Sequence, residues 1–169
     1  MREITTKVYT FDELPEATQD KIIKKWDNAD YDWWERVYED SERVGVTIQE
    51  FDIDRRTISI KCNYPIDTAR KLLEEHGETC DTYILAKSFL DKINPLVEKL
   101  ERIEDRECLR VTQGNLEDEG EDTWPLFHAL GEEYLSILRQ EYEWLTSVEG
   151  IIETIKANEY EFTKQGEMV

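Results

Sequence analysis

Residues 44–62 read VGVTIQEFDIDRRTISIKC, and this stretch decides that the fold contains a β-sheet as well as helices. Apolar residues recur among polar ones over residues 46–53 and again over residues 58–62, as expected of half-buried strands. The polar sequence Asp54-Arg55-Arg56 between the two runs is typical of a turn. Gly45 is a natural end for a preceding helix, because glycine accepts the left-handed conformation found after many helices. The stretch therefore predicts a central β-hairpin that follows a helix.

Helical patterns fill most of the remaining chain. Thr10 and Glu13 have capping-box spacing, and we expect a short turn at residues 11–14 with a helix that begins at Pro15. Further helices are predicted over residues 31–44 and 67–76, from residue 79 onward, beyond residue 125 and after a second capping box formed by Thr146 and Glu149. The helix from residue 79 is expected to continue, with a kink, through Pro95 and to hold a heptad-like seam of Ala86, Phe89, Ile93, Leu96, Leu100 and Ile103.

Short strands are expected near both ends of the sequence, at residues 3–10 and 160–163, and they are placed beside each other. We therefore predict an α+β fold, a helix-rich single domain over residues 1–169 with a small antiparallel sheet. The sequence NLEDEGED at residues 115–122 is expected to form an acidic loop.

The composition is strongly acidic. Forty Asp and Glu against 21 Lys and Arg give a formal net charge of −19 on 169 residues. Such a chain is repelled by phosphates and attracted to basic surfaces, so we expect no direct binding of nucleic acid. No apolar run approaches the roughly 20 residues of a membrane-spanning helix, and the three cysteines show no close pairing. We expect a soluble, cytoplasmic protein with reduced thiols.

Signatures of catalysis are absent from the sequence. There is no glycine-rich phosphate loop and no nucleophile elbow, and only two histidines could serve as a base. Asn115 to Gly120 imitates the start of a calcium loop, but its twelfth position is Leu126, where calcium needs a carboxylate. His76 and Cys80 are four residues apart without a second ligand pair of zinc-site spacing. We therefore expect no enzyme, no catalytic residues, no metal site and no cofactor.

Two acidic stretches hold most of the excess charge. Residues 30–54 contain nine acids and two arginines, and residues 117–143 contain nine acids and one arginine. Carboxylates three or four positions apart on a helix lie about 5–6 Å from each other, a pattern loosely comparable to neighbouring phosphates. Trp33 lies off the helical stripe of Trp34 and Tyr38 and is the first candidate for an exposed aromatic anchor. The predicted partner-binding residues are Asp30, Asp32, Trp33, Glu35, Glu39, Asp40, Glu42, Glu117, Asp118, Glu119, Glu121, Asp122, Glu132 and Glu133.

Both ends of the chain resemble one family of small acidic phage and prophage proteins, some of which are described as antitoxin-like. The resemblance rests on VYTFDELPEATQDKIIKKW at residues 8–26, DYDWWERVYED at residues 30–40 and EEYLSILRQEYEWLTSVEGIIETIKANEYEFTKQG at residues 132–166. The middle of the chain departs from the family pattern. The resemblance implies a viral or mobile-element setting and no catalytic residues.

Three functions and one neutral explanation remain open. The first is an inhibitory protein of the anti-CRISPR or anti-restriction type, which occupies a basic nucleic-acid-binding surface of a host defence effector as a nucleic-acid mimic. The second is an antitoxin-like regulatory partner that uses the heptad-like seam or its helical surface to hold another protein, and the third, less favoured, is a small metal-dependent hydrolase. The neutral explanation is that the charge serves only solubility or adaptation to salt.

Overall fold

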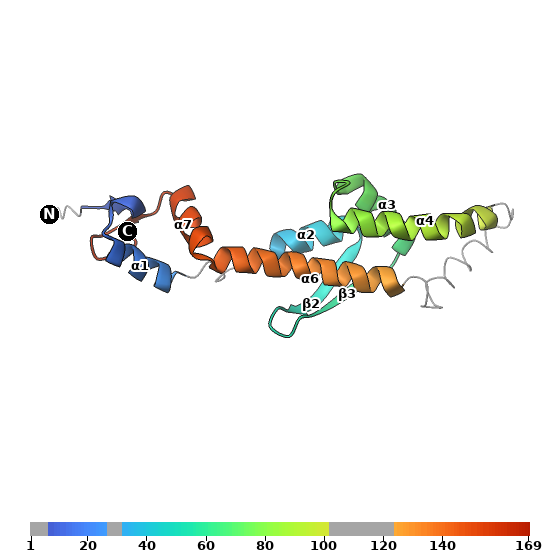
Figure 1. Ribbon diagram of the computed structural model, residues 1–169, viewed down its shortest axis with the longest axis horizontal. Coiled ribbons are helices and arrows are strands. Elements are labelled where there is room, and N and C mark those ends of the chain that lie inside the picture. Colours follow the sequence, from blue (N-terminus) through green and yellow to red (C-terminus); the bar gives the residue numbers. More distant parts are fainter. Residues whose placement is uncertain (1–6, 27–31, 102–123) are drawn as a thin grey trace, which may run out of the picture. The chain divides into compact units, whose positions relative to one another are not determined.

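The computed structural model describes residues 7–26, 32–101 and 124–169 (Figure 1). The helix-rich α+β class predicted from the sequence is confirmed: helices predominate, and two small antiparallel sheets contain two strands each. The elements are β1 (Tyr9–Thr10), the 3-10 turn η1 (Phe11–Glu13), α1 (Glu16–Lys25), α2 (Glu35–Arg43), β2 (Val46–Asp52), β3 (Thr57–Cys62), α3 (Pro65–Glu75), α4 (Asp81–Glu101), α6 (Trp124–Thr146), α7 (Val148–Ala157) and β4 (Glu161–Phe162). None of the described helices is long and apolar enough to cross a membrane.

The contacts within the chain divide it into two compact units. The terminal unit comprises Met1–Trp33 and Gln140–Val169, and the central unit comprises Trp34–Arg139. Helix α6 therefore contributes Trp124–Arg139 to the central unit and Gln140–Thr146 to the terminal unit. The single domain over residues 1–169 stays a prediction, and the acidic loop at residues 115–122 lies outside the described residues.

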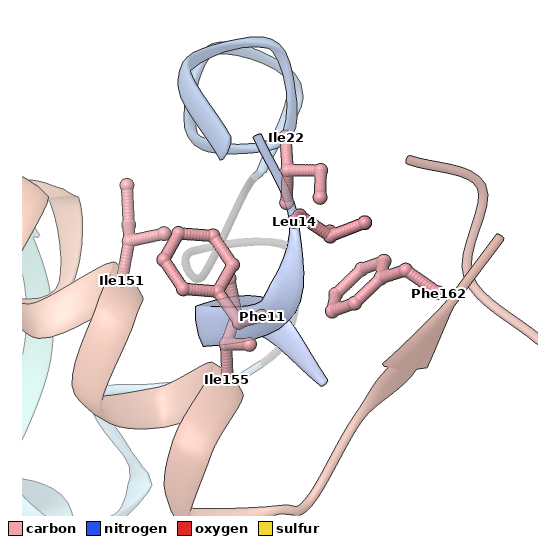
Figure 2. Packing of buried hydrophobic residues seen from close by; sticks show 6 residues of the cluster. All are labelled: Phe11, Leu14, Ile22, Ile151, Ile155 and Phe162. Atoms are coloured by element: carbon pink, nitrogen blue, oxygen red, sulfur yellow. The ribbon is translucent and has the colours of Figure 1, made fainter. Parts of the chain in front are cut away.

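The terminal unit is closed by segments from the two ends of the sequence. Strands β1 and β4 pair antiparallel with Tyr9 opposite Phe162, so the predicted neighbourhood of the two end strands is confirmed. Figure 2 shows the Phe11 ring beside two isoleucines of α7, with other apolar side chains grouped around it. The buried cluster consists of Phe11, Leu14, Ile22, Ile151, Ile155 and Phe162. Because each such side chain contributes about 1.5–3 kcal/mol on burial, this cluster is the main source of stability in the unit.

The start of α1 follows the predicted arrangement. The backbone N–H of Thr10 donates to Glu13 Oε2 at 2.9 Å, which completes the capping box over η1. Pro15 then occupies the N-cap position of α1, where its missing N–H removes no helical hydrogen bond.

The second predicted capping box, on Thr146 and Glu149, is wrong by one residue. Ser147 is the N-cap of α7 and accepts a hydrogen bond from the Gly150 N–H at 2.9 Å. The Thr146 hydroxyl instead donates to the Tyr142 carbonyl at 2.8 Å, within α6. Gly150 is required at this junction, because a Cβ there would collide with the Trp144 carbonyl oxygen.

The central hairpin is confirmed, and its register explains its apolar pattern. Val46 lies opposite Cys62 and Ile48 lies opposite Ile60. The register then shifts, so that Gln49 and Glu50 together face one residue of β3, which is a β-bulge. The extra residue moves Phe51, instead of Glu50, onto the face that holds Ile48, and Phe51 lies opposite Ile58.

Helices pack beside this hairpin in the central unit. Gly45, with φ of +90°, ends α2 as predicted, and its N–H donates to the Glu42 carbonyl at 3.0 Å. Helix α2 packs on β2, and α3 packs on α4. Figure 1 shows α3 and α4 side by side. Helix α4 continues through Pro95, as the sequence predicts, and the described residues of its seam, Ala86, Phe89 and Ile93, are buried in the core.

Candidate partner-binding surface

Helix α2 presents an exposed stripe of carboxylates. Glu35, Glu39 and Glu42 are spaced by four and three residues, so they lie on one face of the helix, and all three are exposed. The opposite face holds the buried residues Val37 and Ser41. Packing of that face fixes the helix and leaves the three carboxylates, here called the outer stripe, in solvent.

The outer stripe is not neutralised by ion pairs within the part of the chain that the structure describes, where none of its three carboxylates has such a partner. Arg36 and Arg43 project from the adjoining side of α2, between the stripe and Asp40. Arg43 Nη2 lies 3.3 Å from Asp40 Oδ1, so this arginine is paired away from the stripe. The stripe therefore keeps a local excess of negative charge.

Asp40 differs from its neighbours, because it faces other helices. His76 Nε2 lies 3.4 Å from Asp40 Oδ2, and His76 Nδ1 lies 2.6 Å from Thr82 Oγ1. The Tyr134 hydroxyl is buried and faces the Asp40 carboxylate, although no hydrogen bond of good geometry joins them. Burial raises the pKa of Tyr134, and the negative charge of Asp40 raises it further. We call Asp40, His76, Thr82 and Tyr134 the inner cluster, and we interpret it as a structural link between α2, α3, α4 and α6.

The inner cluster has the chemical order of a hydrolytic triad, with a hydroxyl, an imidazole and a carboxylate in sequence. Its burial argues against catalysis, however. The Thr82 side chain is only 3% exposed, so a substrate carbonyl has no access to its hydroxyl. No group of three or more His, Cys, Asp or Glu residues within the described ranges could hold a metal ion.

Glu132 and Glu133 point to different sides of α6 and do not continue one acidic row. Glu132 is exposed and its Oε1 lies 3.5 Å from His128 Nδ1. Glu133 is half-buried, and both its burial and the negative charge of Asp81 raise the pKa of its carboxyl. Glu132 is therefore the more accessible of the two carboxylates.

The prediction that Trp33 is exposed is wrong. Its side chain is 9% exposed, and its ring packs on that of Tyr142 with centroids 5.5 Å apart. The helical stripe of α2 does not extend to Trp33, because the residue precedes the helix. Trp34, the N-cap of α2, and Tyr38 pack on Phe51, with ring centroids 6.1 and 6.2 Å apart.

The aromatic side chain most open to solvent in this part of the sequence is Trp144, which is 48% exposed near the end of α6. No sequence signal separates it from the buried Tyr134. Of the remaining predicted residues, Asp32 is exposed in the terminal unit. The others lie outside the described residues: Asp30, Glu117, Asp118, Glu119, Glu121 and Asp122.

Excess negative charge is present in both units. The described part of the central unit has 17 acidic and 11 basic side chains, a net charge of −6, and the described part of the terminal unit has 12 acidic and 6 basic ones, also −6. The charge is therefore broad, and the outer stripe is distinguished by the alignment of three exposed carboxylates on one face of a helix.

Comparison with known proteins gives no relative from which a function could be transferred. No family model, no curated protein and no solved structure matches this chain. The fold and the outer stripe define it only as a helix-rich, acidic α+β protein with a candidate surface for a basic partner.

Proposed function

We propose that this protein is a phage-type inhibitor that binds a basic, nucleic-acid-binding surface of a host defence effector through the outer stripe of α2. The proposal rests on one observation: three aligned, exposed carboxylates that form no ion pair with the described residues. Side chains at these spacings lie about 5–6 Å apart on a helix, so the stripe offers the lysines and arginines of a partner a row of negative groups in place of phosphates.

The setting of this proposal comes from the sequence. The segments around residues 8–26, 30–40 and 132–166 resemble small phage proteins, and the proposed place of action is the cytoplasm of a host cell. Inhibition by occupation of a nucleic-acid site needs no catalytic group and no cofactor. The proposed action is therefore competitive binding.

The antitoxin-like alternative is less well supported. It uses the heptad-like seam or the helical surface for binding, and Ala86, Phe89 and Ile93 of the seam are buried, so only the helical surface is accessible. A partner could reach these side chains only if the central unit opened.

The proposal is tested by recovery of host proteins on the tagged protein, followed by elution with a salt gradient. We expect a basic, nucleic-acid-binding protein that elutes at moderate salt, because exposed charge pairs are screened over about 8–10 Å at physiological ionic strength. The variant Glu35→Gln/Glu39→Gln/Glu42→Gln should lose this partner. The matched variant Glu16→Gln/Glu149→Gln/Glu153→Gln, which removes three exposed charges elsewhere, should retain it. Equal recovery of the partner by both variants would show that the outer stripe is not part of the interface.

A further inference from the structure

A groove separates β3 from α6 in the central unit. It has a volume of about 410 Å³ and is lined by residues 56–60 on the strand side and by Phe127, His128, Gly131, Glu132 and Leu135 on the helix side. This volume lies within the range of about 300–1,000 Å³ that is usual for binding pockets. All of the lining residues belong to the central unit.

The strand side of the groove is the backbone edge of β3. Successive side chains of a strand point to opposite faces of the sheet, so five consecutive residues line one groove only along the edge of the strand. Within the described residues β3 pairs with β2 alone, so its other edge offers backbone N–H and C=O groups.

The helix side is one face of α6. Its lining residues follow the spacing of three and four that places side chains on the same side of a helix. Gly131 forms part of the floor, and a Cβ there would lie 3.4 Å from Ile58 Cγ2 and 3.7 Å from Ile60 Cδ1, which is ordinary van der Waals contact. The absent side chain thus lets the α6 backbone approach Ile58 and Ile60 closely, and Ile58, Phe127 and Leu135 give the groove an apolar lining.

The charged side chains at the rim of the groove determine which extended segments can bind there. The Glu132 side chain is exposed on the helix rim and contacts the weakly basic His128. The surrounding protein is acidic, with a net charge of −19, and its field attracts basic segments. Arg56 is exposed at the end of the groove near the hairpin turn, so a basic residue is favoured only beside Glu132.

We propose that this groove binds an extended, basic segment of a partner protein as a strand added to β3. An apolar side chain of the segment packs on Ile58, Phe127 and Leu135, and a lysine or arginine pairs with Glu132. When a peptide is added as a strand to a sheet edge, its backbone hydrogen bonds provide the affinity. Every second side chain of the peptide contacts the groove and provides the specificity. The site differs from the outer stripe and does not depend on it.

The test begins with selection of a displayed random heptapeptide library on the full protein. The consensus peptide, synthesised with capped ends, is then the probe for NMR titration. We expect an apolar residue next to a basic one in the consensus, and shifts confined to the amides of Thr57–Lys61 and Phe127–Leu135. An acidic consensus, a lack of enrichment, or shifts centred on other residues would overturn the proposal.

Variants and modified peptides separate strand addition from other modes of binding. Leu135→Ala, which removes part of the apolar lining on the helix side, should weaken the probe at least fivefold, and Glu132→Gln should remove the preference for a basic residue. Ile84→Ser, at an exposed apolar position on α4, is the matched control and should bind normally. N-methylation of the peptide should abolish binding at every second position, whereas uniform tolerance would contradict strand addition. The outer-stripe variant should bind the probe normally, so failure of the proposed function and failure of this site are distinguishable.

Discussion

Glu39 and Asp40 are adjacent acids on α2, and they belong to regions with opposite properties. Glu39 is part of the outer stripe and lies in solvent, whereas Asp40 is half-buried and contacts Arg43 and His76. Exposed charges contribute little to stability and are available to a partner, while partly buried polar groups stabilise the fold only as long as their partners remain. The side of α2 on which a carboxylate lies therefore decides whether it stabilises the fold or is available to a partner. Variants of the two regions should therefore separate loss of stability from loss of binding.

The largest effect is expected at the centre of the inner cluster. Tyr134 is fully buried, so Tyr134→Ala should lower the free energy of unfolding by about 3–5 kcal/mol, as for other large aromatic truncations. Tyr134→Phe should cost less than about 1 kcal/mol, because the hydroxyl has no well-formed hydrogen bond. Urea unfolding followed by circular dichroism measures both. If the two variants lost equal stability, the hydroxyl and not the ring would be the essential group.

The second-largest loss of stability is expected at Asp40, in contrast to its neighbour Glu39. Asp40→Ala should lower the free energy of unfolding by about 1–3 kcal/mol, since it leaves His76 and the Tyr134 hydroxyl without the carboxylate that they face. Glu39→Ala, one residue earlier, should change it by less than about 0.5 kcal/mol. Thermal unfolding of the two variants under one buffer condition is the measurement. Similar losses at both positions would contradict the division of α2 into two regions.

A smaller, pH-dependent effect is expected at Glu133. Burial and Asp81 raise the pKa of this carboxyl in the folded protein above the ordinary 4.5, so the folded state holds its proton more tightly than the unfolded state. The stability that this contributes is present below pH 4.5 and is lost as the pH rises through the folded-state pKa. At neutral pH Glu133→Gln should therefore stabilise the protein slightly. The free energy of unfolding of wild type and Glu133→Gln, measured at pH 4 and pH 7, tests this expectation. A stabilisation by Glu133→Gln at pH 4 but not at pH 7 would contradict it.

The smallest effect on stability is expected from the outer stripe. Replacement of Glu35, Glu39 and Glu42 by Gln should change the free energy of unfolding by less than about 0.5 kcal/mol, because all three carboxylates are exposed and form no ion pair with the described residues. A large loss of stability would show instead that the stripe has a structural role, and its effect on binding would then be ambiguous.

Much of the fold follows from local sequence patterns. The hairpin at residues 46–62, the helix end at Gly45 and the turn after Thr10 depend on spacing and on backbone chemistry within a few residues, so they were predictable. The cap of α7 was misplaced, because Thr146 and Ser147 offer the same hydroxyl chemistry and only the backbone geometry selects between them. The bulge at Gln49 and Glu50 was also missed, since the pairing with β3 determines it.

The candidate surface was predictable only in part. Helical spacing is sufficient to align Glu35, Glu39 and Glu42, but it does not distinguish Asp40, whose contacts His76 and Tyr134 are distant in sequence. Trp33 was misassigned because a helical stripe carries no information about a residue before the helix. The groove between β3 and α6 had no signal in the sequence, because it depends on how two distant elements pack.

Competition with nucleic acid for the basic partner is the decisive experiment on the outer stripe. The measurement is displacement of a labelled nucleic acid from the recovered basic partner by the protein, by its outer-stripe variant and by Asp40→Asn, each at low and high salt. The account predicts displacement by the wild type and by Asp40→Asn at a temperature where both are folded, and weakening of that displacement by salt. It also predicts at least tenfold weaker displacement by the outer-stripe variant. Displacement by the outer-stripe variant at the wild-type concentration, or binding of the partner without any displacement, would contradict the claim.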